Sequence, residues 1–328
     1  MNKEVVLEVK DLGITFFTDR GELPAVQNVN FKIHRGETLA VVGESGCGKS
    51  MTALSIMRLI PSPPGKITSG EILYKGNDLV KLSENEICKI RGNEISMIFQ
   101  EPMTSLNPVM TTGKQIMETI MAHNKISKKE AAQRALEIIK LVGISMPEKI
   151  YSSYPHELSG GMRQRIMIAM ALVCRPDLLI CDEPTTALDV TIQAQILKLI
   201  HEMKKELNSS VMIITHDMGV VSEVADYVIV MYAGKIVEYS EVNTLFEKPL
   251  HPYTEGLIKS IPKLDENVDI LETIDGSVPM LYELPEGCFF SPRCKYAREM
   301  CNKKIPGSIE IGENHTVCCW KYTKEWEE

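Results

Sequence analysis

A glycine-rich stretch, GESGCGKS at residues 43–50, has the residue types and spacing of a phosphate-binding loop. Its three glycines let the backbone curl so that several N–H groups face one anion, and the helix expected after it adds the positive end of its dipole. Lys49 can neutralise the β- and γ-phosphates of a nucleotide, and Ser50 can ligate Mg²⁺. The predicted nucleotide-binding residues are Gly43, Glu44, Ser45, Gly46, Cys47, Gly48, Lys49, Ser50 and Met51.

Two carboxylates end a second motif, LLICDE at residues 178–183. Its four apolar residues predict a buried strand, and the carboxylates fall at the carboxyl end, where α/β sheets bind their ligands. Asp182 is suited to hold Mg²⁺ through water, and Glu183 is suited to polarise an attacking water. Alone, such a pair is usually a solvated strand end. Together with the phosphate-binding loop, it predicts hydrolysis of a nucleotide.

A third motif, LSGGM at residues 158–162, lies about 20 residues before LLICDE. Ser159, Gly160 and Gly161 at the start of a helix expose several N–H groups, which form another anion site. By itself the pentapeptide is compatible with simple helix capping. Its position between the other two motifs favours a role at a nucleotide.

The elements that must position these motifs alternate between strand and helix. Strands are expected over residues 3–42, and a helix follows the phosphate-binding loop. Residues 112–174 have helical spacing, whereas residues 178–240 return to strands around a helix at 193–207. This alternation predicts an α/β fold with a mostly parallel core sheet and an antiparallel β edge. The predicted organisation is a domain over 1–240, with a helical subdomain at about 101–174, and a small Cys-rich C-terminal extension over 241–328.

The composition is that of a globular protein, with 328 residues of which 44% are hydrophobic. The net charge of −8 argues against a nucleic-acid partner. The opening residues MNKEVVLEVK lack the apolar core of a signal peptide, and the longest apolar run, residues 166–174, is far shorter than the roughly 20 residues of a membrane helix. We therefore expect a cytosolic protein, in which clustered cysteines are metal ligands or free thiols more often than disulfides.

The order of the motifs resembles that of the ATP-binding cassette (ABC) ATPases. In chain order the motifs are GESGCGKS, Gln100 in MIFQEP, LSGGM, LLICDE, ALD at 187–189 and His216 in IITHD. The resemblance implies the ABC-type P-loop nucleotide-binding fold and an ATPase that uses ATP and Mg²⁺. Met162 replaces the glutamine of the usual LSGGQ signature. Because that position follows the N–H-donating residues, we expect phosphate binding to survive.

The resemblance also implies roles for single residues. Gln100 senses Mg²⁺ and the attacking water, and His216 contacts the γ-phosphate. Phe16, with Phe17 as its rival, occupies the place of the aromatic residue that stacks on adenine. Signature residues of one subunit complete the ATP site of the other. The implied sets are Glu183, His216 and Gln100 for catalysis; Ser50, Gln100 and Asp182 for Mg²⁺; Ser159, Gly160, Gly161 and Met162 for the site in trans; and Asp189 for the link between sites.

Within this family, a membrane importer subunit fits best. The chain has one set of these motifs, whereas the ABC proteins that act in translation usually carry two cassettes in one chain. The DNA-repair and chromosome-organising relatives are excluded because they have a long coiled coil between the phosphate-binding loop and the signature. Here only about 110 residues without heptads separate the two motifs. KPLHPYTEGLIKSIP, residues 248–262, resembles the segment after the cassette in oligopeptide and dipeptide permease ATPases. That resemblance implies peptide import, with nickel or another small solute as an alternative. A soluble regulatory ABC ATPase is the rival from another class.

An importer subunit implies several partners. These are two transmembrane permease subunits, a second ABC ATPase that is a paralogue or a second copy, and, indirectly, an extracellular solute-binding protein. The implied location is the cytoplasmic face of the cell membrane, as a peripheral subunit.

Five cysteines lie within 32 residues near the end of the chain. The expected ligands are Cys288, Cys294, Cys301 and Cys319. The last choice follows from the resemblance to the peptide-permease ATPases, whose cysteine pattern ends in a small residue, Cys and an aromatic residue or His, as in Cys318-Cys319-Trp320. Cys318 is the second choice for the last ligand. Four thiolates can hold a [4Fe–4S] cluster or a tetrahedral zinc ion. The spacings lack the short C-x₂₋₄-C pairs of structural zinc sites, which favours the cluster over zinc. Free thiols or a disulfide remain as further interpretations.

Overall fold

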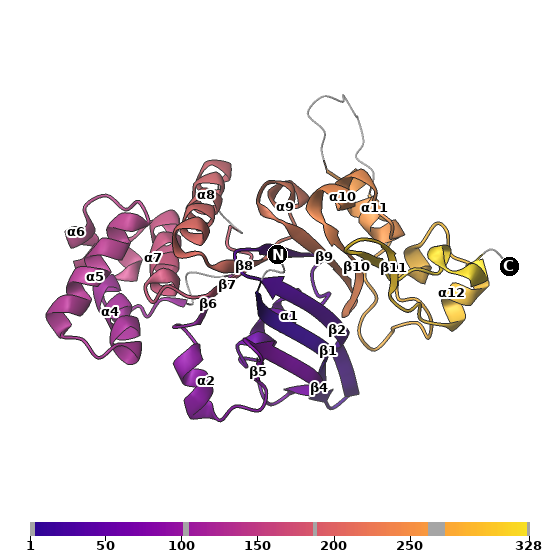
Figure 1. The fold of residues 1–328 in the computed structure, drawn as a ribbon, viewed down its shortest axis with the longest axis horizontal. Helices are drawn as coiled ribbons and strands as arrows, with labels where there is room; N and C mark the ends of the chain where they lie inside the picture. Colours follow the sequence, from indigo (N-terminus) through magenta and orange to yellow (C-terminus); the bar gives the residue numbers. More distant parts are fainter. Residues whose placement is uncertain (1–3, 101–104, 186–188, 262–272, 327–328) are drawn as a thin grey trace. The chain divides into compact units, whose positions relative to one another are not determined.

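The computed structural model describes residues 4–100, 105–185, 189–261 and 273–326. Their backbone forms two compact units (Figure 1). Unit 1 contains the described residues of 1–6, 33–37 and 81–213, and unit 2 contains those of 7–32, 38–80 and 214–328. The phosphate-binding loop therefore belongs to unit 2, and the LSGGM and LLICDE motifs belong to unit 1.

Unit 1 contains parallel strands that are buried along their whole length. β6 (Ile95–Ile98) pairs in parallel with β7 (Leu178–Asp182), and β8 (Ser210–Ile214), whose last residue falls in unit 2, is the next neighbour of β7. Their apolar runs are typical of strands with both faces covered. The sheet order brings the carboxyl end of β7, with its two carboxylates, to the same edge as the end of β6.

The helices of unit 1 include a group that confirms the predicted helical segment near 112–174. The group contains α4 (Thr112–His123), α5 (Lys128–Leu141), α6 (Pro147–Ser152), the short helix η1 (Pro155–Glu157) and α7 (Gly160–Leu172), drawn in magenta and pink in Figure 1. α2 (Glu84–Ile90) precedes β6, and α8 (Val190–Leu207) follows β7. On α8, Ile196, Leu199, Ile200 and Met203 recur at helical spacing and are buried.

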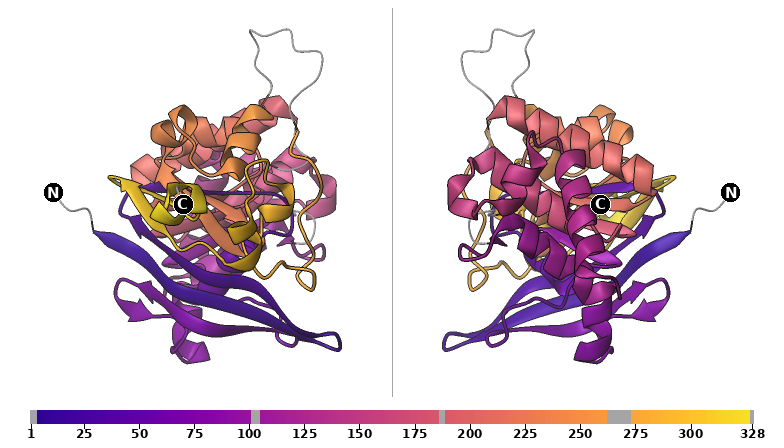
Figure 2. Two further views of the ribbon diagram at one scale, coloured as in Figure 1. Left: turned by 90° about the vertical axis from the view of Figure 1, so that its right-hand side faces the viewer. Right: turned by 90° about the vertical axis from the view of Figure 1, so that its left-hand side faces the viewer.

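Unit 2 begins with an antiparallel sheet in the order β2-β1-β4-β5. β1 (Val5–Thr18) and β2 (Gly21–His34) form the long indigo ribbon visible in Figure 2. β4 (Gly65–Tyr74) pairs with β1, and β5 (Asn77–Asp78) pairs with β4. This sheet is the predicted antiparallel β edge.

A second sheet of unit 2 carries the phosphate-binding loop and reaches into the tail of the chain. β3 (Thr38–Val42) pairs in parallel with β9 (Tyr227–Tyr232), and β9 pairs antiparallel with β10 (Lys235–Glu241). β12 (His315–Val317) pairs with β10, and β11 (Ile309–Gly312) pairs with β12. The tail beyond residue 240 thus adds two strands to this sheet, while the domain boundary at 240 stays a prediction.

Short helices complete unit 2. They are α1 (Lys49–Ile56), α9 (Met218–Val224), α10 (Val242–Glu247), α11 (Pro252–Lys259), α12 (Glu299–Lys303) and the 3₁₀ turns η2 (Ser291–Arg293), η3 (Trp320–Tyr322) and η4 (Lys324–Trp326). None of the helices in the described ranges combines the length and apolarity that a bilayer crossing requires.

Candidate active site

The phosphate-binding loop has a backbone that requires glycine at its first position. Gly43 follows β3 with a φ of +149°, and a Cβ there would lie 2.2 Å from the carbonyl oxygen of Met231. Gly48 precedes α1 with a φ of +99°, which favours glycine as well. The loop therefore curls as its sequence predicts, and it ends at the amino end of a helix.

Lys49 is buried and turns its amino group back onto the loop. Its Nζ donates hydrogen bonds of 2.7 Å to the carbonyl oxygen of Gly43 and 3.0 Å to that of Glu44. The Sγ of Cys47 lies 3.8 Å from the same Nζ. Burial raises the pKa of the Cys47 thiol, which keeps it neutral.

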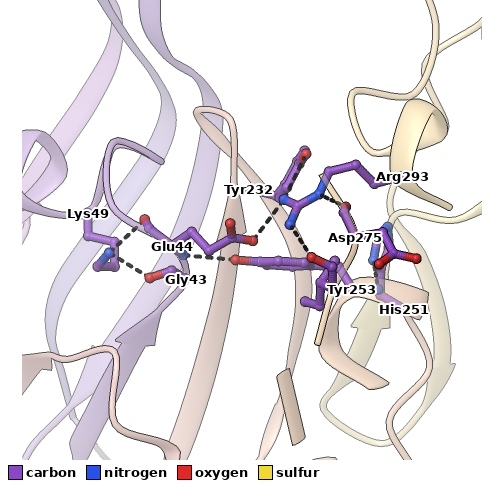
Figure 3. A network of polar contacts seen from close by, with 9 residues as sticks. Gly43, Glu44, Lys49, Tyr232, His251, Tyr253, Asp275 and Arg293 are labelled. Atoms are coloured by element: carbon purple, nitrogen blue, oxygen red, sulfur yellow. Dashed lines mark hydrogen bonds and ion pairs between the residues drawn. The ribbon is translucent and has the colours of Figure 1, made fainter. Parts of the chain in front are cut away.

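Glu44 connects this loop to the tail, a connection that the sequence analysis missed. Its backbone N–H donates a 2.8 Å hydrogen bond to the hydroxyl of Tyr253 on α11. Its carboxylate accepts a 2.9 Å hydrogen bond from Arg293, which lies in η2 of the cysteine-bearing tail (Figure 3). Tyr253 lies in the quoted segment KPLHPYTEGLIKSIP, and the sequence analysis assigned no role to either tail residue.

The remaining unit 2 candidates differ in exposure. Ser50 and Met51 are half-buried in α1, and His216 is exposed just after β8. Phe16 is half-buried in β1 opposite Gly65, whereas the rival Phe17 is 46% exposed. An exposed aromatic face suits stacking on a base, but neither phenylalanine is singled out by its contacts.

In unit 1, Gln100 and Glu183 lie together. Asp182 is buried as the last residue of β7, and Glu183 follows with a φ of +46°, a left-handed conformation that is uncommon for glutamate. The Nε2 of Gln100 donates a 2.8 Å hydrogen bond to Oε2 of Glu183. Two residues that the sequence analysis assigned to water and Mg²⁺ chemistry are therefore in direct contact.

The signature motif occupies a helix start, as predicted. Ser159 caps α7 by accepting a hydrogen bond from the N–H of Met162, and both Ser159 and Gly160 are exposed. A Cβ at Gly160 would meet nothing within 4 Å, so this face is open. Asp189 is exposed and caps α8 through the N–H of Ile192. Residues 187 and 188 of the ALD motif lie outside the described residues.

Four of the clustered cysteines share one cavity in unit 2. Cys288, Cys294, Cys301 and Cys319 line it, together with His251 and aromatic residues of the tail. Cys318 is not among the lining residues; its N–H donates instead to the carbonyl of Val237. The four cysteines predicted as ligands therefore lie around one cavity, and Cys318 does not line it.

The thiols are not already disposed as a metal site. Within the described residues, no group of three or more His, Cys, Asp or Glu side chains is arranged to hold a metal ion, and all nine cysteines are free thiols. Burial, with smaller contributions from neighbouring cysteines, raises the pKa of Cys288 to about 12 and that of Cys319 to about 11. The four predicted cysteines thus share a cavity, but the described structure does not support the [4Fe–4S] expectation.

Comparison with known proteins identifies the family. Residues 26–186 match the family described as ABC transporter, and residues 237–301 match the one described as oligopeptide/dipeptide transporter, C-terminal region. The oligopeptide transport ATP-binding protein AppD of Bacillus subtilis is 55% identical over 323 residues, covering 98% of each chain. The chain belongs to the oligopeptide/dipeptide branch of the ABC transporter ATP-binding proteins. The dipeptide transport ATP-binding protein DppD of the same organism is 52% identical over 97% of this chain and 95% of that protein.

Solved structures of ABC cassettes agree with this assignment. The dimeric post-hydrolysis state of the cassette MJ0796 bound to ADP and Pi has a TM-score of 0.65 at 28% identity, covering 72% of this chain and 98% of that one. The cbiO1 structure from Clostridium perfringens has a TM-score of 0.64 at 30% identity, covering 75% and 92%. The predicted ABC-type α/β fold is confirmed, whereas the Cys-rich extension stays a prediction. As a member of this ABC family, the chain is an ATPase that hydrolyses ATP.

Proposed function

We propose that this ABC ATPase powers the import of oligopeptides or dipeptides through separate membrane permease subunits. The observation that carries the proposal is the similarity to peptide-transport ATP-binding proteins along nearly the whole chain, including the region 237–301 that is particular to that branch. A cassette alone would account for the phosphate-binding loop and signature, but not for this tail.

The roles of the site residues follow from their chemistry. Lys49 neutralises charge on the transferred phosphoryl group, and loop N–H groups bind the phosphates. Glu183, held by Gln100, orients and polarises the attacking water, and His216 contacts the γ-phosphate. Ser50, Gln100 and Asp182 supply hydroxyl, amide and carboxylate oxygens, a donor set that fits Mg²⁺, which offsets phosphate charge when bound.

A second cassette completes each ATP site. The exposed start of α7 offers the N–H groups of Ser159, Gly160 and Gly161 to a nucleotide held by the partner, with Met162 beside them, and Asp189 at the start of α8 links the two sites. We propose a paralogous partner, with a second copy of this chain as the alternative. Two permease subunits and an external solute-binding protein complete the importer, which places this chain at the cytoplasmic face of the membrane.

The tail cavity is proposed to hold a metal through Cys288, Cys294, Cys301 and Cys319. Its four thiols supply the donors that a [4Fe–4S] cluster needs, and zinc is the alternative. Because the pKa values of Cys288 and Cys319 are raised, these thiols are protonated near neutral pH, and metal binding would have to displace their protons. The metal would act as a structural support that fixes a tail poor in apolar residues.

Reconstitution with the permease subunits tests the function. The chain, a partner cassette and the two permease subunits are placed in vesicles with the solute-binding protein, and uptake of radiolabelled peptides is measured with and without ATP. ATP-dependent peptide uptake that stops with Glu183→Gln is expected. Uptake of Ni²⁺ but not of peptides, or no association with membrane subunits, would refute the proposal.

A further inference from the structure

Glu44 of the phosphate-binding loop is held from three sides. Its carbonyl oxygen accepts from Lys49 Nζ at 3.0 Å, its N–H donates to Tyr253 at 2.8 Å, and its carboxylate accepts from Arg293 at 2.9 Å (Figure 3). The first contact belongs to the loop itself. The other two come from residues more than 200 positions away, so the tail fixes both the backbone and the side chain of one loop residue.

Arg293 is fixed in turn. Its side chain is only 5% exposed, and its guanidinium also donates to the carbonyl oxygens of Asp275 at 2.8 Å and Ile274 at 3.3 Å and to the hydroxyl of Tyr232 at 3.4 Å. A planar fork with several fixed acceptors has little freedom to turn away. Hydrogen bonding to a carboxylate at this distance is among the stronger polar contacts.

The same segment also borders the cysteine cavity. Arg293 lies between Cys288 and Cys294, and Phe290 both lines that cavity and packs against Tyr232 and Tyr253, with ring centroids 5.2 and 5.5 Å apart. Tyr232 and Tyr253 are themselves 4.8 Å apart, edge to face. A packed aromatic cluster therefore joins the cysteine-bearing turn to the residues that hold Glu44.

We propose that Arg293 is a positioning residue for nucleotide binding, which holds the Glu44 carboxylate away from the bound phosphates and offsets its charge. This inference rests on the proposed ATP site at the phosphate-binding loop. A triphosphate bound beside Gly43 is repelled by a free carboxylate one residue along. Turning that carboxylate into an ion pair with the tail removes the repulsion and leaves Lys49 unopposed.

The test is a double-mutant comparison on the full-length chain, with binding of a fluorescent ATP analogue and Mg²⁺ as the readout. Arg293→Met should weaken binding roughly tenfold, the size expected for loss of one charge-assisted contact. In a Glu44→Ala background the same change should alter affinity by less than about twofold, since no carboxylate is left to hold. In the assembled importer, the KM for ATP should rise while kcat stays within about twofold.

Two further variants serve as controls. Lys295→Met removes a nearby tail cation that pairs with Glu255 at 3.2 Å, and it should leave affinity unchanged. Arg293→Lys keeps a cation opposite Glu44 and should retain affinity within about threefold. If Arg293→Met does not fold, as judged by circular dichroism and thermal unfolding, the neutral, polar Arg293→Gln in the same two backgrounds replaces it.

The outcomes distinguish a failure of the positioning role of Arg293 from a failure of the proposed ATP site. Equal weakening by Arg293→Met with and without Glu44 would mean that Arg293 only supports the tail, and unchanged affinity would mean that it does not act on the loop; either result overturns the inference. Failure of the unaltered chain to bind ATP would overturn the proposed ATP site instead.

Discussion

Gln100 and Glu183 are 83 residues apart in sequence, yet their side chains are joined by a 2.8 Å hydrogen bond in which Gln100 Nε2 is the donor. The bond fixes one carboxylate oxygen of Glu183. Glu183 also has a left-handed backbone conformation, which directs its side chain differently from an extended strand residue. A carboxylate held in this way is suited to bind water in one orientation.

Glu183→Gln tests this carboxylate. The amide oxygen can still accept from Gln100, so the side chain should keep its place while losing its ability to take a proton. We expect kcat for ATP hydrolysis to fall by at least about 100-fold, with ATP affinity unchanged. Single-turnover hydrolysis and nucleotide binding measure the two effects. Glu148→Gln, an exposed residue of α6, is the matched control; normal turnover by the Glu183 variant would refute its role.

Tyr253→Phe tests the backbone contact to the phosphate-binding loop. The substitution removes the hydroxyl that accepts from the Glu44 N–H but keeps the buried ring. We expect unfolding free energy to fall by about 1 kcal/mol, as for loss of one buried hydrogen bond, and ATP binding to weaken. Chemical denaturation and nucleotide binding measure these effects. Tyr322→Phe, which removes a hydroxyl donating to Leu250, should destabilise the tail without changing affinity.

Glu238→Gln tests an anchor of the tail. This fully buried carboxylate of β10 accepts from the N–H groups of Leu250 and His251 and is bonded to Nε2 of His315 on β12 at 2.8 Å. The amide offers only one acceptor oxygen, so at least one buried donor loses its partner. We expect a loss of about 2 kcal/mol in unfolding free energy. Glu247→Gln, exposed on α10, should have no such effect.

Cysteine-to-serine variants test the tail cavity. Cys319 lines the cavity and Cys318 does not, so Cys319→Ser should lower the bound metal at least about tenfold while Cys318→Ser retains it. Iron, acid-labile sulfide and zinc are measured after anaerobic purification. About four irons with sulfide indicate a cluster, and one zinc without colour indicates the alternative. Equal metal loss in both variants would contradict the ligand assignment, and a metal-free unaltered chain would contradict the site.

The parts of the site that could be predicted are those encoded in short contiguous stretches. The loop at 43–50 curls because its glycines allow it, and α7 begins where Ser159 can cap it. α8 was expected from residue 193, but it starts at Val190 because Asp189 caps it. Cap and turn chemistry acts over three or four residues, so sequence alone can indicate it.

Contacts between distant segments could not be predicted in this way. Nothing in the local pattern around Arg293 shows that it bonds to Glu44, 249 residues earlier, because that pairing depends on where the sheet and tail bring them. The left-handed conformation of Glu183 is likewise uncommon for glutamate, so its residue type does not predict it. Both features determine how the site residues are positioned, whereas the sequence motifs indicate which ligand the site binds.

The pairing of β12 with β10 has a consequence for shortened forms of the chain. β10 has β9 on one side and the tail strand β12 on the other, and the edge of the sheet on the tail side is the four-residue β11. A chain ending near residue 241 would leave the outer backbone groups of β10 unpaired. Open strand edges recruit other strands, so such a fragment is expected to self-associate. The tail strands would thus also limit aggregation by covering this edge of β10.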